Sequence, residues 1–210
     1  MALAFTNRAA DADNSDAISY ATPAFTPSAS AGILVAVWTS KATAPDLPVL
    51  DLPSWLSGLW TTEIDNTVEA NRRLTIFSGY TVASPGSAAL TATFGLTQTA
   101  CYIIVDDVTG QDVTDFVLQP ISENEATGNT ASITLASGLA STESAIWSAC
   151  GTNVNEAIAP TGGETELADI GTTGPVSRLQ TQFQINDTTS SVSWASSAVQ
   201  VVIAALEVKA

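Results

Sequence analysis

The sequence has no histidine, and its six lysine and arginine residues face 21 aspartate and glutamate residues. Without histidine the usual catalytic triads and His-ligated metal sites are excluded, so we do not expect an ordinary hydrolase. The formal net charge is -15, and the one adjacent basic pair is Arg72-Arg73. Phosphate backbones and anionic lipids bind clustered basic residues, so we expect neither nucleic-acid nor membrane binding.

Long hydrophobic runs are also missing. The most apolar stretch of the first half, "AGILVAVWTS" at residues 31–40, is far shorter than the roughly 20 apolar residues of a membrane helix. Asp11, Asp13 and Asp16 precede it, and we see no basic, apolar export signal. Its β-branched residues and turn-forming flanks predict a core strand buried on both faces.

Only two cysteines are present, Cys101 and Cys150, each in an apolar, strand-like context. They are interpreted either as two buried thiols or as one disulfide, and the sequence leaves both open. Two cysteines without histidine do not make a zinc site. We therefore predict no metal and no cofactor.

Acidic residues concentrate in "DADNSD" and "VDDVTGQDVTD", which raises the question of calcium. An EF-hand loop needs glycine at its sixth position and glutamate at its twelfth. Counted from Asp11, these positions hold Asp16 and Thr22. The motif is absent, and solvated turns are the simpler interpretation. A looser calcium site formed by Asp11, Asp13 and Asp16, or by Asp106, Asp107 and Asp112, is the alternative.

Serine, threonine, alanine and glycine dominate, whereas charged residues make up 13% of the chain. Roughly ten to twelve short strand-like segments alternate with turn residues, which is typical of a sandwich or barrel. No segment repeats at a fixed period. We predict an all-β, jelly-roll-like antiparallel β-sandwich that forms a single domain over residues 1–210, with long loops at about 41–62 and 153–175.

Two segments alternate clearly. In "ALTATF" the pattern places Leu90, Ala92 and Phe94 inward, and "RLQTQFQI" has Leu179 and Phe183 on one side. Both predict half-buried antiparallel strands. The closing "AVQVVIAALEV" is expected to form a long strand.

Three acidic pairs stand two residues apart, which on a strand puts both carboxyl groups on one face. A glycosidase needs two carboxyls that face each other across a sugar, which spacing within one strand does not show. We therefore do not expect an enzyme. The pairs are Glu63 with Asp65, Glu123 with Glu125, and Glu164 with Glu166.

The five tryptophans divide into two groups. Trp38, Trp147 and Trp194 lie within strand patterns and are predicted core residues. Trp55 and Trp60 lie in the proline-rich loop 41–62, where they either pin the loop to the sandwich or form a sugar-binding platform.

Three segments carry a resemblance to a known class of proteins. They are "ALAFTNRAADADNSDAISYATPAFTPSASAGILVAVW", "ALTATFGLTQTACYIIVDDVTG" and "SVSWASSAVQVVIAALEVKA". In this pattern the chain resembles the small β-sandwich virion proteins of tailed bacteriophages, which decorate heads or build tail appendages. The resemblance implies a structural protein without catalytic residues, made in the host bacterial cytoplasm and assembled into the virion.

The resemblance further implies a capsid decoration, or cement, protein that binds the major capsid protein and itself, with a homotrimer favoured. The alternative is a receptor- or glycan-binding module of a tail or head fibre. We expect the contact surfaces in the N-terminal segment and the two long loops, with the candidate contact residues Phe5, Tyr20, Trp55, Trp60, Glu164 and Glu166.

Overall fold

The computed structural model describes residues 2–68, 71–125, 128–198 and 200–210, which form sixteen strands. The first half contains β1 (Ala4–Asp13), β2 (Ala17–Ala21), β3 (Gly32–Ser40), β4 (Val49–Leu50), β5 (Thr61–Val68), β6 (Arg72–Tyr80), β7 (Thr91–Gln98) and β8 (Ala100–Thr109). The second half contains β9 (Val117–Glu125), β10 (Gly128–Thr134), β11 (Ala145–Thr152), β12 (Ala159–Pro160), β13 (Thr165–Thr173), β14 (Val176–Ile185), β15 (Thr189–Ala198) and β16 (Val201–Val208). Within these ranges no helix is long and apolar enough to cross a membrane.

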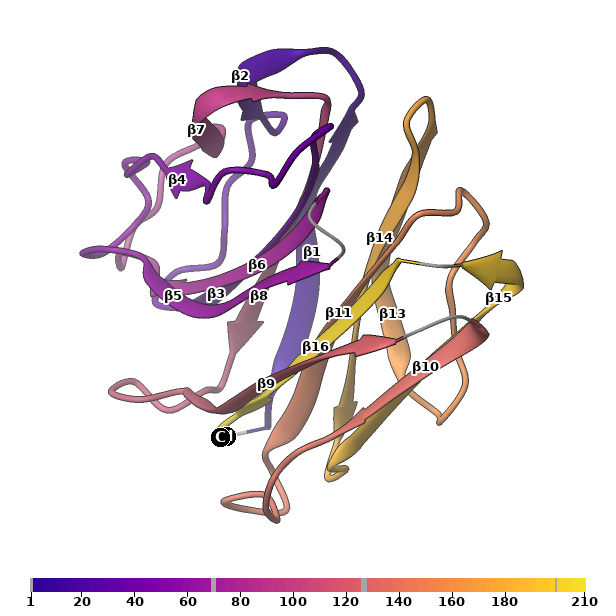
Figure 1. Cartoon of the computed structure of the whole chain (residues 1–210). Helices are drawn as coiled ribbons and strands as arrows, with labels where there is room; N and C mark the ends of the chain where they lie inside the picture. The colour runs from indigo at the N-terminus through magenta and orange to yellow at the C-terminus, as the bar shows by residue number, and fades with distance from the viewer. Residues whose placement is uncertain (1, 69–70, 126–127, 199) are drawn as a thin grey trace.

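The strands form four antiparallel sheets stacked as layers (Figure 1). The first half supplies an inner sheet, β1-β8-β3-β6-β5, and an outer sheet, β2-β7-β4. The second half supplies an inner sheet, β13-β14-β11-β16-β9, and an outer sheet, β10-β15-β12. The two inner sheets face each other, which confirms the predicted all-β sandwich.

The second half repeats the topology of the first. Replacing β1 to β8 by β9 to β16 in order turns each sheet of the first half into the corresponding sheet of the second. In each half the first strand pairs with the eighth strand. The third strand lies between the eighth and the sixth, as in a jelly roll. The contacts between halves are reciprocal, because β1 lies against β13 and β9 against β5. This is the geometry of an approximate two-fold pair within one chain.

Irregularities of the sheets are repeated too. The edge strands β5 and β13 each carry a bulge, and the aspartate that follows it pairs with an arginine on the neighbouring strand. In the first half Arg73 lies 3.4 Å from Asp65, and in the second half Arg178 lies 2.6 Å from Asp169. β1 and β9 are likewise bulged against β8 and β16.

A buried carboxylate fixes the loop before the third strand in both halves. Each carboxylate lies near the end of the last strand of its half. It accepts one hydrogen bond from a backbone amide of this loop and one from a side chain at the bulge of the first strand. Asp107 accepts from Ser28 N at 2.7 Å and from Arg8 Nε at 2.6 Å, and Glu207 accepts from Ala140 N at 2.6 Å and from Gln119 Nε2 at 2.8 Å.

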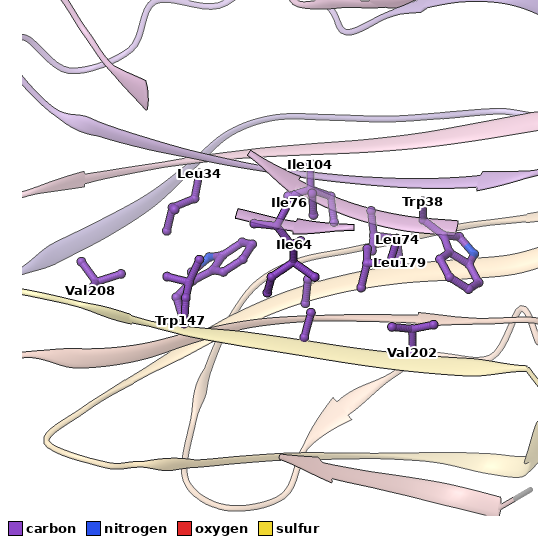
Figure 2. Packing of buried hydrophobic residues seen from close by; sticks show 14 of the residues in the cluster. Leu34, Trp38, Ile64, Leu74, Ile76, Ile104, Trp147, Leu179, Val202 and Val208 are labelled. Atoms are coloured by element: carbon purple, nitrogen blue, oxygen red, sulfur yellow. The ribbon is translucent and has the colours of Figure 1, made fainter. Parts of the chain in front are cut away.

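The main core lies between the inner sheets, and Figure 2 shows its side chains meeting from both halves. Trp38 lies at one end of this labelled group, and Trp147 lies toward the other end, beside Val208. Gly151 leaves room for the Trp38 ring, because a Cβ at Gly151 would lie 2.5 Å from it. In each half a further core lies between the inner sheet and its outer sheet.

The strand at 31–40 is buried throughout, and Leu90, Ala92 and Phe94 point inward, as predicted. Of the acidic segment "DADNSD", residues 11–13 belong to β1 and residues 14–16 form the bend before β2, while the expected loop 153–175 contains β12 and β13. The predicted closing strand is divided between the end of β15 and β16, with Val199 outside the described residues.

β14 is buried more completely than its alternation predicts. Gln180 and Gln182 are fully buried beneath the outer sheet β10-β15-β12, where Gln182 Nε2 donates to Ser190 Oγ at 2.7 Å. Four layers rather than two explain this, because an inner sheet has no solvent-facing side. The assignment of one domain to residues 1–210 stays a prediction.

Candidate docking surface

The predicted aromatic contact residues are mostly inside the molecule. Tyr20 and Trp55 are buried, and their polar atoms bond internally, with Tyr20 Oη donating to the Gln98 carbonyl at 2.9 Å. Phe5 is half-buried and stacks on Phe183 of the other half, with ring centroids 4.3 Å apart. Neither Tyr20 nor Trp55 therefore offers a ring to a partner in this conformation.

The two predicted acidic contact residues have different environments. The Glu164 carboxylate is buried and accepts hydrogen bonds from the backbone amides of Gly162 at 2.7 Å and Ser191 at 2.5 Å. Glu166 is exposed on β13. The structure thus gives Glu164 a role in closing the β12–β13 turn and leaves Glu166 at the surface.

Two further acidic residues of the sequence pairs, Glu63 and Asp65, form contacts within the molecule. Glu63 accepts a hydrogen bond from Ser78 Oγ at 2.5 Å, and Asp65 lies beside Arg73. Burial raises the pKa of Glu63, the Ser78 hydroxyl lowers it, and Asp115 raises it further. Within the described ranges no three histidine, cysteine, aspartate or glutamate side chains gather as metal ligands.

An apolar groove of about 400 Å³ opens beside β4. It lies between β4, which is the last strand of its outer sheet, and the start of β5, which is the last strand of its inner sheet. Thr62 supplies its only side-chain hydroxyl. Its lining residues are Leu47, Pro48, Val49, Leu50, Leu52, Leu59, Trp60, Thr62 and Phe77.

Trp55 and Trp60 hold this loop in place. The buried Trp55 ring packs on Phe25, and its carbonyl accepts a hydrogen bond from Val82 N at 2.9 Å. Trp60 meets Trp55 edge to face, and its indole N–H donates to the Asp51 carbonyl at 2.7 Å. The loop is therefore anchored from within, and its aliphatic side chains are held at the surface.

The apolar side chains that line the groove are unusually exposed to solvent. Val49 is 68% and Leu59 is 75% exposed, and Leu47 and Leu52 are exposed as well. Most of the large apolar side chains that the described residues expose lie on this outer sheet or its loop. A contiguous apolar patch of this kind marks an interaction site more often than an isolated exposed leucine does.

The equivalent region of the second half is built differently. The chain between β12 and β13 is residues 161–164, whereas the chain between β4 and β5 is residues 51–60. Glu164 closes the shorter turn through its hydrogen bonds. Outward-facing positions of the outer sheet there are hydroxyl side chains, among them Thr130, Ser132, Ser191 and Ser193.

A larger hollow of about 640 Å³ lies where the two halves join, around residues 110–114. Its Asp112 carboxylate is paired with Lys209 at 2.8 Å, and Val113 is its one large exposed apolar side chain. The Lys209 and Thr114 hydrogen bonds hold the pKa of Asp112 well below its usual range. This hollow offers less apolar surface than the groove beside β4.

Sequence reasoning identified the loop 41–62 but only its tryptophans as contacts. The leucines and Val49 that line the groove were missed, although "DLPVLDLPSWLSGLW" places apolar residues between prolines that prevent a regular strand. Comparison with known protein families, with curated proteins and with solved structures gave no match to this chain.

Proposed function

We propose that the protein is a structural protein of a tailed-bacteriophage particle, a capsid decoration protein that binds the outer surface of the major capsid shell and stabilises it. The observation that carries the proposal is the anchored apolar groove at one outer layer of an otherwise well-packed β-scaffold. The resemblance noted in the sequence supplies the kind of particle.

The distribution of polarity supports attachment by one end. The outer sheet of the first half exposes Ile18, Val49 and Leu96, whereas the outer sheet of the second half presents serine and threonine hydroxyls. Apolar side chains gain free energy when a partner covers them, and hydroxyls remain well hydrated. The first half then contacts the shell, and the second half faces solvent.

The proposed partners are the major capsid protein and further copies of this chain, with a homotrimer favoured at threefold positions of the shell. A stable attachment needs on the order of 800 Å² per partner, which is more than the groove alone provides. Contacts from the rest of the outer sheet and from neighbouring copies would add to it. The proposed location is the virion, after synthesis in the host bacterial cytoplasm.

The experiment uses heads of the encoding phage assembled without this protein. Labelled wild-type protein, Leu59→Ser and the matched control Val176→Ser, which removes an exposed apolar side chain of β14, are titrated onto the heads and the bound copies are counted. Saturation at a symmetric copy number, improved heat resistance of the heads and weaker binding of Leu59→Ser support the proposal. Failure of the wild-type protein to bind contradicts it.

A receptor- or glycan-binding module of a tail or head fibre is the second candidate. The observation that favours it is Trp60, whose partly exposed ring lines the groove. Sugar sites also need several convergent polar groups, and Thr62 is the one hydroxyl side chain of the lining. Binding of a glycan array that is lost in Trp60→Ala and kept in Val176→Ser would favour this candidate over the capsid.

A further inference from the structure

The groove beside β4 lies between two strand edges. β4 pairs with β7 on one side, β5 pairs with β6 on one side, and each ends the order of its sheet. A strand at a sheet edge presents backbone groups to which an extended segment can add. Side chains from both edges, including Val49 and Thr62, line the space between them.

The volume of the groove fits a short extended peptide segment better than the surface of a folded domain. About 400 Å³ accommodates a few side chains, and the apolar lining has no ring of polar groups to orient a small molecule. Extended segments present alternate side chains to one face, so every second residue would enter the groove.

The charges beside the groove restrict the occupant further. Asp46 and Asp51 adjoin its lining residues in sequence, and Lys41 already pairs with Asp46 at 3.1 Å. Among the described residues, the exposed Asp51 forms no salt bridge. A second copy of the chain, which has a net charge of -15, would bring further acidic residues to the edge of the groove. A basic partner is favoured by complementarity.

We infer that the groove binds an extended apolar segment of a partner protein that carries lysine or arginine beside its apolar residues, and that this segment adds along the free edges of β4 and β5. The inference rests on the proposed function only for the identity of the partner. The same surface chemistry would apply to a partner outside the capsid.

The test is selection from a library of random short peptides on the whole immobilised protein. The expected peptides alternate apolar and polar residues and contain lysine or arginine. Leu59→Ser is expected to weaken them about tenfold, the loss of roughly one buried leucine contact. Val176→Ser should bind them as the wild type does.

A charge variant separates the two components of recognition. Asp51→Asn keeps an acceptor oxygen for Thr91 N. It is expected to weaken the selected basic peptides severalfold and to reduce the salt dependence of their binding. Unchanged affinity and salt dependence would refute the charge complementarity.

Hydrogen exchange locates the bound peptide. Slower exchange at residues 47–52 and 61–63 supports strand addition, whereas protection confined to other segments overturns it, as do acidic selected peptides or a failure to select any. If peptides select the groove but heads do not bind the protein, the inference stands and the capsid proposal fails. If heads bind the wild-type protein but no peptide is selected by the groove, the capsid proposal stands and the inference fails.

Discussion

The indole N–H of Trp147 in the second half donates to Asp106 Oδ2 in the first half, at a distance of 3.0 Å. Asp106 is fully buried between the inner sheets and also accepts from Asn7 Nδ2 at 2.9 Å. Burial raises the pKa of Asp106 to about 6, although the hydrogen bonds from Asn7 and Trp147 and the nearby Thr181 hydroxyl lower it and the neighbouring Asp107 raises it. A titrating carboxyl therefore lies at the contact between the two halves.

This carboxyl predicts a pH-dependent stability. The unfolded state releases the Asp106 proton near its ordinary pKa, below that of the folded state, so the free energy of unfolding falls as pH rises from about 4 to about 6. Asp106→Asn keeps an acceptor oxygen but has no proton to release. Urea unfolding at about pH 4 and about pH 7 should show a drop that is smaller in the variant, by at most about 3 kcal/mol. Equal drops in both proteins would contradict the assignment.

The repeated ion pairs predict unequal effects in the two halves. The Asp169 side chain is 9% exposed and also accepts from Ile158 N, whereas the Asp65 side chain is 38% exposed. Asp169→Asn leaves the half-buried Arg178 without its countercharge and is expected to lower the free energy of unfolding by about 2 kcal/mol. Asp65→Asn should cost less than about 1 kcal/mol, because exposed pairs contribute little.

Both variants are compared with the wild type by urea unfolding at neutral pH. A double-mutant cycle of Asp169→Asn with Arg178→Met measures the coupling directly. A cost for Asp65→Asn equal to that for Asp169→Asn would show that burial does not decide the strength of these pairs.

The close approach of Trp38 to Gly151 predicts intolerance to the smallest side chain. Gly151→Ala places a Cβ 2.5 Å from the ring, so a strand or the ring must move, and the expected cost is about 3 kcal/mol. Gly138→Ala is the control, because nothing lies within 4 Å of its Cβ. Thermal unfolding should show a lower melting temperature for Gly151→Ala alone. If Trp38→Leu does not reduce the cost of Gly151→Ala, the clash is not with the indole.

The two thiols predict slow chemistry in the native state. Cys101 and Cys150 are free and buried, in different cores, and burial raises the pKa of both thiols. A thiol-specific reagent such as Ellman's reagent should therefore react with neither cysteine in native protein and with both in denaturant. A disulfide recovered from protein denatured without reductant would contradict the free thiols.

The pattern of residues predicted the strand class because it depends on local chemistry. "AGILVAVWTS" and "ALTATF" have side chains whose shape and alternation suit strands, and both are strands with the expected burial. The duplication was missed for a physical reason. The loops of the two halves differ in length, so the separation in sequence between equivalent residues is not constant. It is different for the pair Asp65 and Asp169 than for the pair Phe94 and Trp194, and no fixed period therefore exists.

The candidate site was only partly accessible to sequence reasoning. The loop 41–62 was identified by its prolines, but exposure of a leucine depends on what covers it, and that is a long-range property. Trp55 and Trp60 lie in the same proline-rich segment, so the sequence does not distinguish them. In the structure Trp55 packs on Phe25 and is buried, whereas Trp60 is only half-buried and lines the groove.

The sequence by itself determined an acidic, histidine-free, all-β chain, because charge, catalytic groups and side-chain shape belong to individual residues. The tertiary structure decided that eight strands are repeated as eight more and that the two inner sheets share one core. It also decided that apolar side chains near β4 remain uncovered. These features depend on pairing and packing between residues far apart in the chain, where several arrangements satisfy the same local preferences.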